Sequence, residues 1–209
     1  MGLFRAQAQD SAAVILPQPR LESSTSIEAA LRLRRSMRDY EKGPLALSEI
    51  SQLLWAAQGI TDPEGLRTAP SAGALYPLEV YLAAGDVDSL SPGIYRYTPD
   101  GHKLVAISQG DARLALCKAA RDQECVRGAA AVIVITAVYQ RTTKKYGQRG
   151  IQYAHIEVGC ASENIYLQAV ALNLGVVYVG AFSDEEVSAI LNLKGSEQPL
   201  AILPIGRIR

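Results

Sequence analysis

The sequence lacks an excess of charge of either sign. Its 209 residues include 21 Lys and Arg residues and 21 Asp and Glu residues, so the formal net charge at neutral pH is zero. Proteins that bind nucleic acids through bulk charge must neutralise many phosphates and are usually basic. The balance therefore predicts no nucleic-acid partner, although a local site for a single phosphate group stays open.

Residues that bind metals or form disulfide bonds are also few. The chain has two histidines and three cysteines, and Cys117, Cys125 and Cys160 show no C-x-x-C spacing. An odd number of cysteines without metal-ligand spacing favours free thiols in a reducing compartment. We therefore expect a cytoplasmic protein without a metal site, and we expect His155 and Cys160 to be packed within a helix.

No segment is long and apolar enough to cross a membrane. The longest apolar run, from Ala129 to Val138, falls well short of the ~20 residues that a membrane-spanning helix needs. Residues 1–16 contain one arginine, an aspartate and no long apolar block, so they do not have the pattern of a signal peptide. We expect no membrane segment.

Several catalytic motifs are missing as well. The sequence has no GxxxxGK[S/T], HExxH or GxSxG motif, and no GxGxxG motif follows a predicted strand. No serine or cysteine stands in a recognisable arrangement with histidine. Kinases, common hydrolases and Rossmann-type dehydrogenases therefore lack their usual signatures here.

What the sequence does contain is a cluster of hydrogen-bond donors at the predicted end of a helix, formed by Arg34, Arg35, Ser36 and Arg38. Guanidinium groups bind phosphate bidentately, and a serine hydroxyl adds a further hydrogen bond. The alternative is a solvated basic helix end that complements the helix dipole. Considered alone, this stretch favours the solvated helix end. The neighbouring segments are needed to distinguish it from a phosphate site.

Periodicity and capping signals predict the helices. Thr25 is the expected N-cap of the first helix, with Glu28 completing a capping box, and Ser48 is the expected N-cap of a second helix that ends at Gly59. Further helices are predicted at residues 111–117, 122–127, 152–174 and, after a capping box at 183–186, around 187–191. Residues 141–150 are interpreted as a basic, glycine-containing connection.

β-Branched runs and turn signals predict the strands. Residues 130–138 form the expected central strand, buried on both faces. Residues 93–97 and 103–107 flank a turn signal and predict a hairpin, with His102 exposed beside the turn. Strands are also expected at residues 79–83, 176–179 and 200–205. We predict an α+β domain over residues 25–209, preceded by an extended arm at residues 1–24.

The predicted long helix carries two apolar stripes. One stripe consists of Ile151, Ala154, Val158, Ala161 and Ile165, and the other of Ile156, Cys160, Leu167, Val170 and Leu174. A helix that is apolar on two sides must be covered on two sides. The sheet of the same chain can cover one stripe. Either a second subunit or the interior of a monomer can cover the other.

The chain also contains an ordered set of short motifs: RRSxR at 34–38, LLWAAQG at 53–59, APSAGALYPLEVY at 69–81, PGIYRY at 92–97, KYGQRG at 145–150, EVGxxxxNxxLQA at 157–169, VGAF at 179–182 and PIG at 204–206. Taken in order, these motifs resemble the nitroreductase family of FMN flavoproteins, and more closely its SagB-type branch of azoline-oxidase-like dehydrogenases. The resemblance covers residues 26–209. Many relatives have a histidine where Cys160 stands.

The resemblance implies a mixed sheet wrapped by helices, in an intertwined homodimer with two FMN sites at the subunit interface. In such a site, phosphate and ribityl contacts would come from Arg34, Arg35 and Ser36, with Arg38 near the pyrimidine edge of the ring. The second subunit would pack Pro70, Ser71, Ala72 and Gly73 against the ring. The turn at Gly180 and Ala181 would meet flavin N5, and Arg207, with Arg209, would close on the phosphate.

Three functions are consistent with this resemblance. The first is an FMN-dependent oxidoreductase that uses NAD(P)H and a small acceptor such as a nitroaromatic or a quinone. The second is an azoline dehydrogenase in peptide modification, in which Lys145 and Tyr146 supply the base that removes a ring proton. The third is a flavin-binding module without turnover. For Lys145 and Tyr146 a purely structural role, in a solvated turn, is an equally good interpretation.

Overall fold

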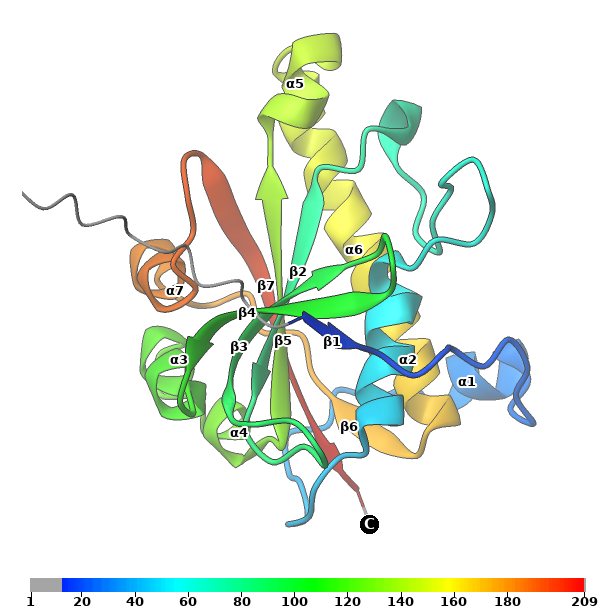
Figure 1. The fold of residues 1–209 in the computed structure, drawn as a ribbon, viewed down its shortest axis with the longest axis vertical. Coiled ribbons are helices and arrows are strands. Elements are labelled where there is room, and N and C mark those ends of the chain that lie inside the picture. The colour runs from blue at the N-terminus through cyan, green and yellow to red at the C-terminus, as the bar shows by residue number, and fades with distance from the viewer. Residues whose placement is uncertain (1–12, 209) are drawn as a thin grey trace, which may run out of the picture.

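The computed structural model describes residues 13–208 of the chain. Within these residues a seven-stranded sheet has the order β1-β4-β3-β2-β5-β7-β6 (Figure 1). The strands are β1 (Ala13–Ile15), β2 (Leu78–Ala84), β3 (Gly93–Thr98), β4 (Lys103–Gln109), β5 (Ala131–Val138), β6 (Leu174–Val176) and β7 (Glu197–Arg207). All pairs of these strands are antiparallel, and parallel pairing is confined to isolated bridges such as that between Ser36 and Val176.

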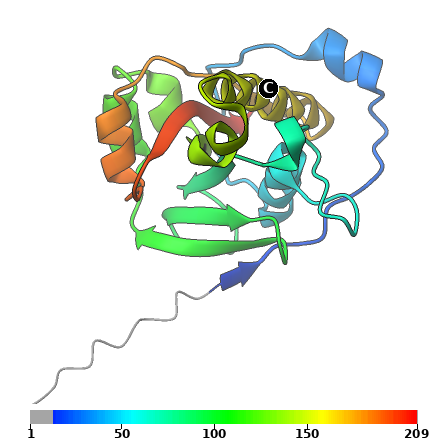
Figure 2. The same ribbon diagram turned by 90° about the horizontal axis from the view of Figure 1, so that it is seen from above.

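Helices cover both faces of the sheet, which confirms the predicted α+β fold (Figures 1 and 2). One face packs against α2 (Leu47–Gln58) and α6 (Arg149–Ala171), and the other against α3 (Arg113–Ala119), α4 (Glu124–Gly128) and α7 (Asp184–Ile190). The remaining helices are α1 (Ile27–Leu33), which lies beside α6, and α5 (Gln140–Tyr146), which leads into α6. None of the helices in this part of the chain could span a bilayer.

The central strand is the predicted one. In β5, residues 131–137 are buried and only Val138 is half-exposed. β5 pairs with β2 on one side and β7 on the other, and its side chains alternate between the two apolar cores. A continuous run of apolar, mostly β-branched residues suits a strand that is covered on both faces.

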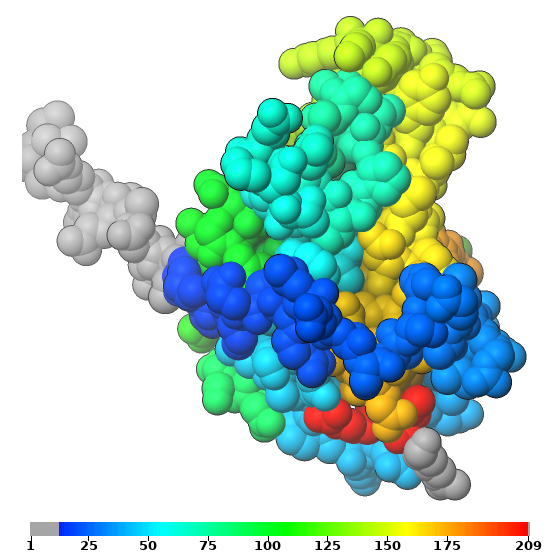
Figure 3. All heavy atoms as spheres, turned by 90° about the vertical axis from the view of Figure 1, so that its right-hand side faces the viewer, coloured from blue at the N-terminus to red at the C-terminus, as the bar shows by residue number. Residues whose placement is uncertain are grey.

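The chain reaches α1 by crossing the outside of the molecule. β1 pairs with β4 at the edge of the sheet, and the segment that follows passes over α2 and α6 before α1 begins (Figures 1 and 3). Gln52 of α2 holds this segment by exchanging hydrogen bonds with the backbone of Arg20, at 2.8 and 3.0 Å. Residues 1–12 of the predicted arm lie outside the described residues, and its boundary with the domain stays a prediction.

Several predicted boundaries and environments are wrong. Ser26 rather than Thr25 caps α1, and α2 begins at Leu47, so Ser48 lies inside it. Residues 140–146 form α5 instead of an irregular connection. The long helix ends at Ala171, which places Leu174 in β6 instead of the second apolar stripe.

The burial of both histidines is the opposite of what was expected. His102, expected to be exposed, is only 9% exposed, whereas His155, expected to be packed, is exposed. His102 is buried because Ser51 of α2 and Tyr97 of β3 hydrogen-bond its two ring nitrogens, at 2.6 and 2.9 Å. Ser51 lies in α2, about fifty residues earlier in the sequence, and the Pro17 carbonyl, which also lies against the ring, belongs to the segment after β1. The turn sequence around His102 therefore gives no signal for these two partners.

The two stripes of α6 differ in burial. Ala154, Val158, Ala161 and Ile165 of the first stripe are buried against the sheet. In the second stripe Ile156 is 56% exposed, and Leu167 and Val170 are half-buried. The second stripe therefore remains available to a second subunit, as the homodimer prediction requires.

Candidate functional site

The basic cluster lies in an extended segment that follows α1. The helix ends at Arg34, whose backbone torsions (φ −52°, ψ 124°) leave the helical region. The segment then runs beside β6, where the amide of Met37 donates to the carbonyl of Val176 at 2.9 Å. This backbone contact fixes where Ser36 and its neighbouring arginines stand.

Arg34 is held by the second half of α6. Its Nε lies 3.6 Å from Glu163 Oε1, and its guanidinium carbon lies 5.1 Å from the centre of the Tyr166 ring. Glu163 and Tyr166 are three residues apart, so they share one face of the helix. Both side chains of the ion pair are partly exposed, which leaves the guanidinium accessible to an anion.

Ser36 is oriented by a chain of hydroxyl groups. The Tyr166 hydroxyl oxygen accepts a hydrogen bond from the amide of Tyr178 at 2.7 Å and lies 3.2 Å from Ser36 Oγ. Tyr166 can therefore donate its own proton to Ser36 Oγ. In that arrangement the hydroxyl hydrogen of Ser36 is free to point at a bound anion.

Arg35 and Arg38 supply further positive charge at the surface. Arg35 donates from Nη1 to the backbone carbonyls of Arg32 and Arg34, at 3.0 and 2.7 Å. Arg38 is exposed and makes no hydrogen bond or ion pair within residues 13–208. A cavity of about 300 Å³ opens beside Arg35, with Met37, Tyr166, Val170 and Ile208 among its lining residues.

The small-residue loop lies at the other half of α6. Ala72 donates its amide to Glu157 Oε1 at 2.9 Å, and Ser71 Oγ accepts from the amide of Tyr76 at 2.8 Å. Glu157 is buried, and burial raises the pKa of its carboxyl group, while its hydrogen bonds with Ala72 and Ser71 oppose that shift. Glu157 thus fixes the position of this loop, while Pro70 and Gly73 remain exposed.

Gly73 brings the loop against the Lys-Tyr pair of α5. Its φ of +62° lies in the left-handed region, and a β-carbon built there would lie 2.6 Å from Tyr146 Oη and 2.9 Å from Lys145 Nζ. Lys145 also lies over the Tyr146 ring, 5.3 Å from its centre. The candidate base and the candidate flavin-packing loop therefore form one cluster, a contact that the sequence alone did not predict.

The turn at Gly180 and Ala181 is exposed. It follows an isolated bridge between Val179 and Ile202, and the Ala181 carbonyl accepts from Gln123 Nε2 at 3.3 Å. The nearest atom to a β-carbon built on Gly180 would be Tyr178 Cε1 at 3.4 Å. A flat ring could approach this backbone closely.

Arg207 is engaged within the chain. Its Nη1 and Nη2 donate to the two carboxylate oxygens of Glu49 at 2.7 and 2.8 Å, and its Nε and Nη2 donate to the Pro44 carbonyl at 3.2 and 3.0 Å. A phosphate contact from Arg207 would require this pairing with Glu49 to rearrange. Arg209 lies outside the described residues.

Within one chain the predicted site residues fall into two groups. Arg34 and Ser36 contact Tyr166, whereas Ala72 contacts Glu157, and these two positions are about 14 Å apart along the axis of α6 at 1.5 Å per residue. That each site takes the loop at residues 70–73 from a second subunit stays a prediction.

Sequence reasoning missed the side chains that position these groups, namely Glu157, Glu163, Tyr166 and Glu49. A weak signal was present in α6, because Glu157 lies among the residues of the buried stripe and a buried carboxylate needs partners. The roles of Tyr166 and Glu49 depend on contacts across more than one hundred residues. No local pattern could indicate them.

Comparison with known proteins gives a family match. The sequence profile of the nitroreductase family matches residues 31–207. The candidate nitroreductase MJ1384 of Methanocaldococcus jannaschii is 46% identical over 181 residues, which cover 87% of this chain and 90% of that protein. The microcin B17-processing protein McbC of Escherichia coli is 27% identical over 168 residues. That alignment covers 78% of this chain but only 62% of McbC.

A solved structure has the same fold over almost its whole length. The crystal structure of a candidate nitroreductase from Ralstonia eutropha JMP134 has a TM-score of 0.82 and 29% sequence identity. The match covers 94% of this chain and 90% of that one. The resemblance seen in the sequence motifs is thus confirmed by sequence and by structure.

Proposed function

The chain belongs to the nitroreductase family, a family of oxidoreductases, and we propose that it is an FMN-dependent enzyme that uses NAD(P)H to reduce a nitroaromatic, quinone or similar small molecule. FMN, when bound, would supply hydride transfer at its N5 atom, and the protein would supply binding, orientation and charge. The observation that carries the proposal is the basic segment after α1, which combines three arginines and an oriented serine hydroxyl, with a cavity beside Arg35.

This segment fits a phosphate monoester. Arg34 offers a partly exposed guanidinium, Arg38 offers one without a partner within residues 13–208, and Ser36 can donate its hydroxyl hydrogen. Guanidinium and hydroxyl donors are those that recognise phosphate oxygens with charge-assisted hydrogen bonds. Arg38 would also stabilise negative charge on a reduced ring next to it.

The proposed enzyme is a homodimer with shared sites. The half-exposed second stripe of α6 supports this arrangement, because a partner subunit can cover it. The loop at residues 70–73 would pack against the ring bound by the other subunit, where glycine and alanine allow close approach. The exposed turn at Gly180 and Ala181 would offer its backbone N–H groups to N5.

The test is to identify the flavin and then to remove one phosphate ligand. We expect the purified protein to be yellow and to release FMN, not FAD, on denaturation. Arg34→Ala should weaken FMN binding by about tenfold to a hundredfold, since one hydrogen bond to a charged group is lost. Arg127→Ala, which removes an exposed arginine paired with Glu124, should bind FMN normally. Colourless protein that cannot be reconstituted with FMN would refute the proposal.

A second candidate function is favoured by the cluster of Gly73, Lys145 and Tyr146. Oxidation of an azoline to an azole removes a hydride and a proton, so it needs a base beside the hydride acceptor. The cluster places an amine and a phenol against the loop that is proposed to pack on the flavin. McbC, a relative of this chain, is named for the processing of microcin B17, which supports a peptide-modifying role.

A further inference from the structure

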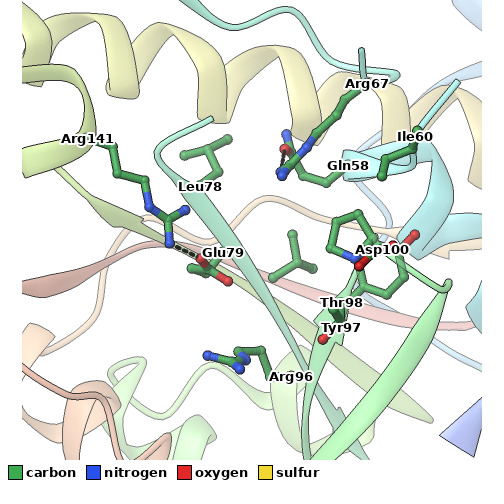
Figure 4. Close-up of a pocket in the computed structure, with 12 residues that line it drawn as sticks. Gln58, Ile60, Arg67, Leu78, Glu79, Arg96, Tyr97, Thr98, Asp100 and Arg141 are labelled. Atoms are coloured by element: carbon green, nitrogen blue, oxygen red, sulfur yellow. Dashed lines mark hydrogen bonds and ion pairs between the residues drawn. The ribbon is translucent and has the colours of Figure 1, made fainter. Parts of the chain in front are cut away.

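A cavity of about 470 Å³ lies apart from the residues assigned to flavin binding (Figure 4). Its lining includes Arg67, Arg96 and Arg141, and its floor includes the apolar side chains of Leu78 and Val80. We call it the Arg67 cavity. Its volume falls within the range of small-molecule sites, about 300–1,000 Å³.

The cavity forms where two strands separate. β2 and β3 pair from Val80 and Tyr97 onwards, but Leu78 and Glu79 pair only with β5, because the chain of β3 turns away after Thr98. The end of β2 is therefore open on one side. Two elements close over this opening. One is the segment that carries Arg67, and the other is the end of α2, which carries Gln58.

Gln58 and Tyr76 hold the side chain of Arg67, and one of its donors has no partner among the described residues. Its Nη1 donates to Gln58 Oε1 at 2.9 Å, and its guanidinium carbon lies 4.3 Å from the centre of the Tyr76 ring. Its Nε is buried and has no hydrogen-bond partner within residues 13–208. Buried donors are rarely left unpaired, because desolvation without a partner is unfavourable.

The surrounding charges leave a positive excess. Glu79 is neutralised by an ion pair with Arg141, which also donates to the Tyr76 carbonyl at 2.9 Å. Arg96 and Asp100 are exposed and lie at the rim. Arg67 also lines the cavity; burial lowers the pKa of its guanidinium, the charge of Glu79 opposes this shift, and a further anion beside Arg67 would oppose it as well.

We propose that the Arg67 cavity binds the carboxylate group of a small, partly apolar molecule. The free Nε edge of a guanidinium matches the two coplanar oxygens of a carboxylate, and such bidentate pairs are the strong form of this interaction. Leu78 and Val80 would contact the apolar part of the ligand. None of the residues assigned to flavin binding lines this cavity, so the proposal does not depend on the proposed oxidoreductase activity.

Benzoate is a suitable probe, with benzamide as its uncharged isostere. In the purified 209-residue chain, the Nε–H signal of Arg67 can be followed by ¹H–¹⁵N NMR and assigned by its disappearance in Arg67→Lys. Benzoate should shift this signal downfield in a saturable manner, and benzamide should not. Arg67→Lys should weaken benzoate binding by about tenfold or more, whereas Arg127→Gln, at an exposed ion pair, should leave it unchanged.

Three results would overturn the proposal. If benzoate at tens of millimolar leaves the Nε–H signal unshifted, no carboxylate binds at Arg67. If benzamide shifts it equally, the site does not recognise charge. If phenyl phosphate binds more tightly than benzoate, the site is one for phosphate esters. Because the readout is a shift at Arg67 and not turnover, each result is distinguishable from a failure of flavin binding.

Discussion

Tyr146 occupies the space into which a side chain on Gly73 would project. The distance from a β-carbon built on Gly73 to Tyr146 Oη would be 2.6 Å, well inside normal contact. The loop at residues 70–73 and helix α5 therefore approach each other closely at Gly73, which has no side chain to displace Tyr146 or Lys145. Any side chain at residue 73 must displace Tyr146, Lys145 or the loop.

Gly73→Ala should impair turnover more than it impairs stability. The substitution places alanine at φ +62°, and such strain costs about 1–3 kcal/mol. The atoms that it meets are the ends of flexible side chains, so Tyr146 and Lys145 can move away at little further cost. Gly65→Ala is the matched control, because Gly65 has φ +85° and open space around it.

Urea unfolding and steady-state kinetics separate the two effects. Both variants should lose a similar free energy of unfolding, and only Gly73→Ala should lower kcat. Equal kcat values in the two variants would show that the positions of Lys145 and Tyr146 do not matter for the reaction assayed.

The sequence was most informative where structure is determined locally. Strand β5 follows from its continuous apolar run, the β3–β4 hairpin from its turn residues, and the start of α7 from Ser183, whose Oγ accepts from the Glu186 amide at 3.3 Å. The sequence did not predict the burial of His102, because that burial depends on Ser51, which lies in a helix about fifty residues earlier. Resemblance supplied the candidate site residues, and the structure added the side chains that orient them.

Val170→Glu tests the homodimer. Val170 lies half-buried on the second stripe of α6, which a partner subunit would cover in the proposed dimer. Burial of an unpaired carboxylate in an apolar interface is strongly unfavourable, so the variant should be monomeric or insoluble and should hold little flavin. Leu114→Glu is the control, since Leu114 is 52% exposed on α3, against the opposite face of the sheet.

Sedimentation velocity gives the oligomeric state, and absorbance gives the flavin content of the same samples. Leu114→Glu should behave as the parent protein does. A flavin-loaded, stable monomer of Val170→Glu would contradict the shared site.

His102 should make stability depend on pH. Burial lowers the pKa of its imidazole, although its hydrogen bond with the Pro17 carbonyl opposes this shift. The other groups against the ring are the hydroxyls of Ser51 and Tyr97. As pH falls through about 6.5, the unfolded chain binds a proton before the folded chain does, so the free energy of unfolding decreases until the lowered folded pKa is passed.

Urea unfolding between about pH 7.5 and about pH 5 measures the slope of the free energy of unfolding against pH. His102→Gln should be less stable at every pH, because it loses hydrogen bonds, but its slope should be smaller. His155→Gln changes the other histidine, which is exposed, and should keep the parent slope. If His102→Gln and the parent have the same slope, protonation of His102 is not linked to unfolding.

The last prediction distinguishes the two candidate activities through Lys145 and Tyr146. Reduction of a quinone needs no base in the protein, whereas aromatisation of an azoline requires one to take the ring proton as hydride leaves. The two side chains contact each other and Gly73, so both stand at the loop proposed to pack on the flavin. Lys145→Ala and Tyr146→Phe should therefore still bind FMN and still reduce quinones.

Both variants should lose azoline oxidation by about a hundredfold or more, the effect typical of a lost general base. Lys144→Ala is the matched control, because Lys144 is an exposed neighbour on α5 that lies outside the contact with Gly73. If Lys145→Ala and Tyr146→Phe oxidise an azoline at the rate of the parent protein, the two side chains have a structural role. If the parent protein itself oxidises no azoline, even with a cyclising partner enzyme supplied, the tyrosine and lysine serve another purpose and the reduction of small acceptors stands as the activity, because that reaction needs only the flavin and its binding residues.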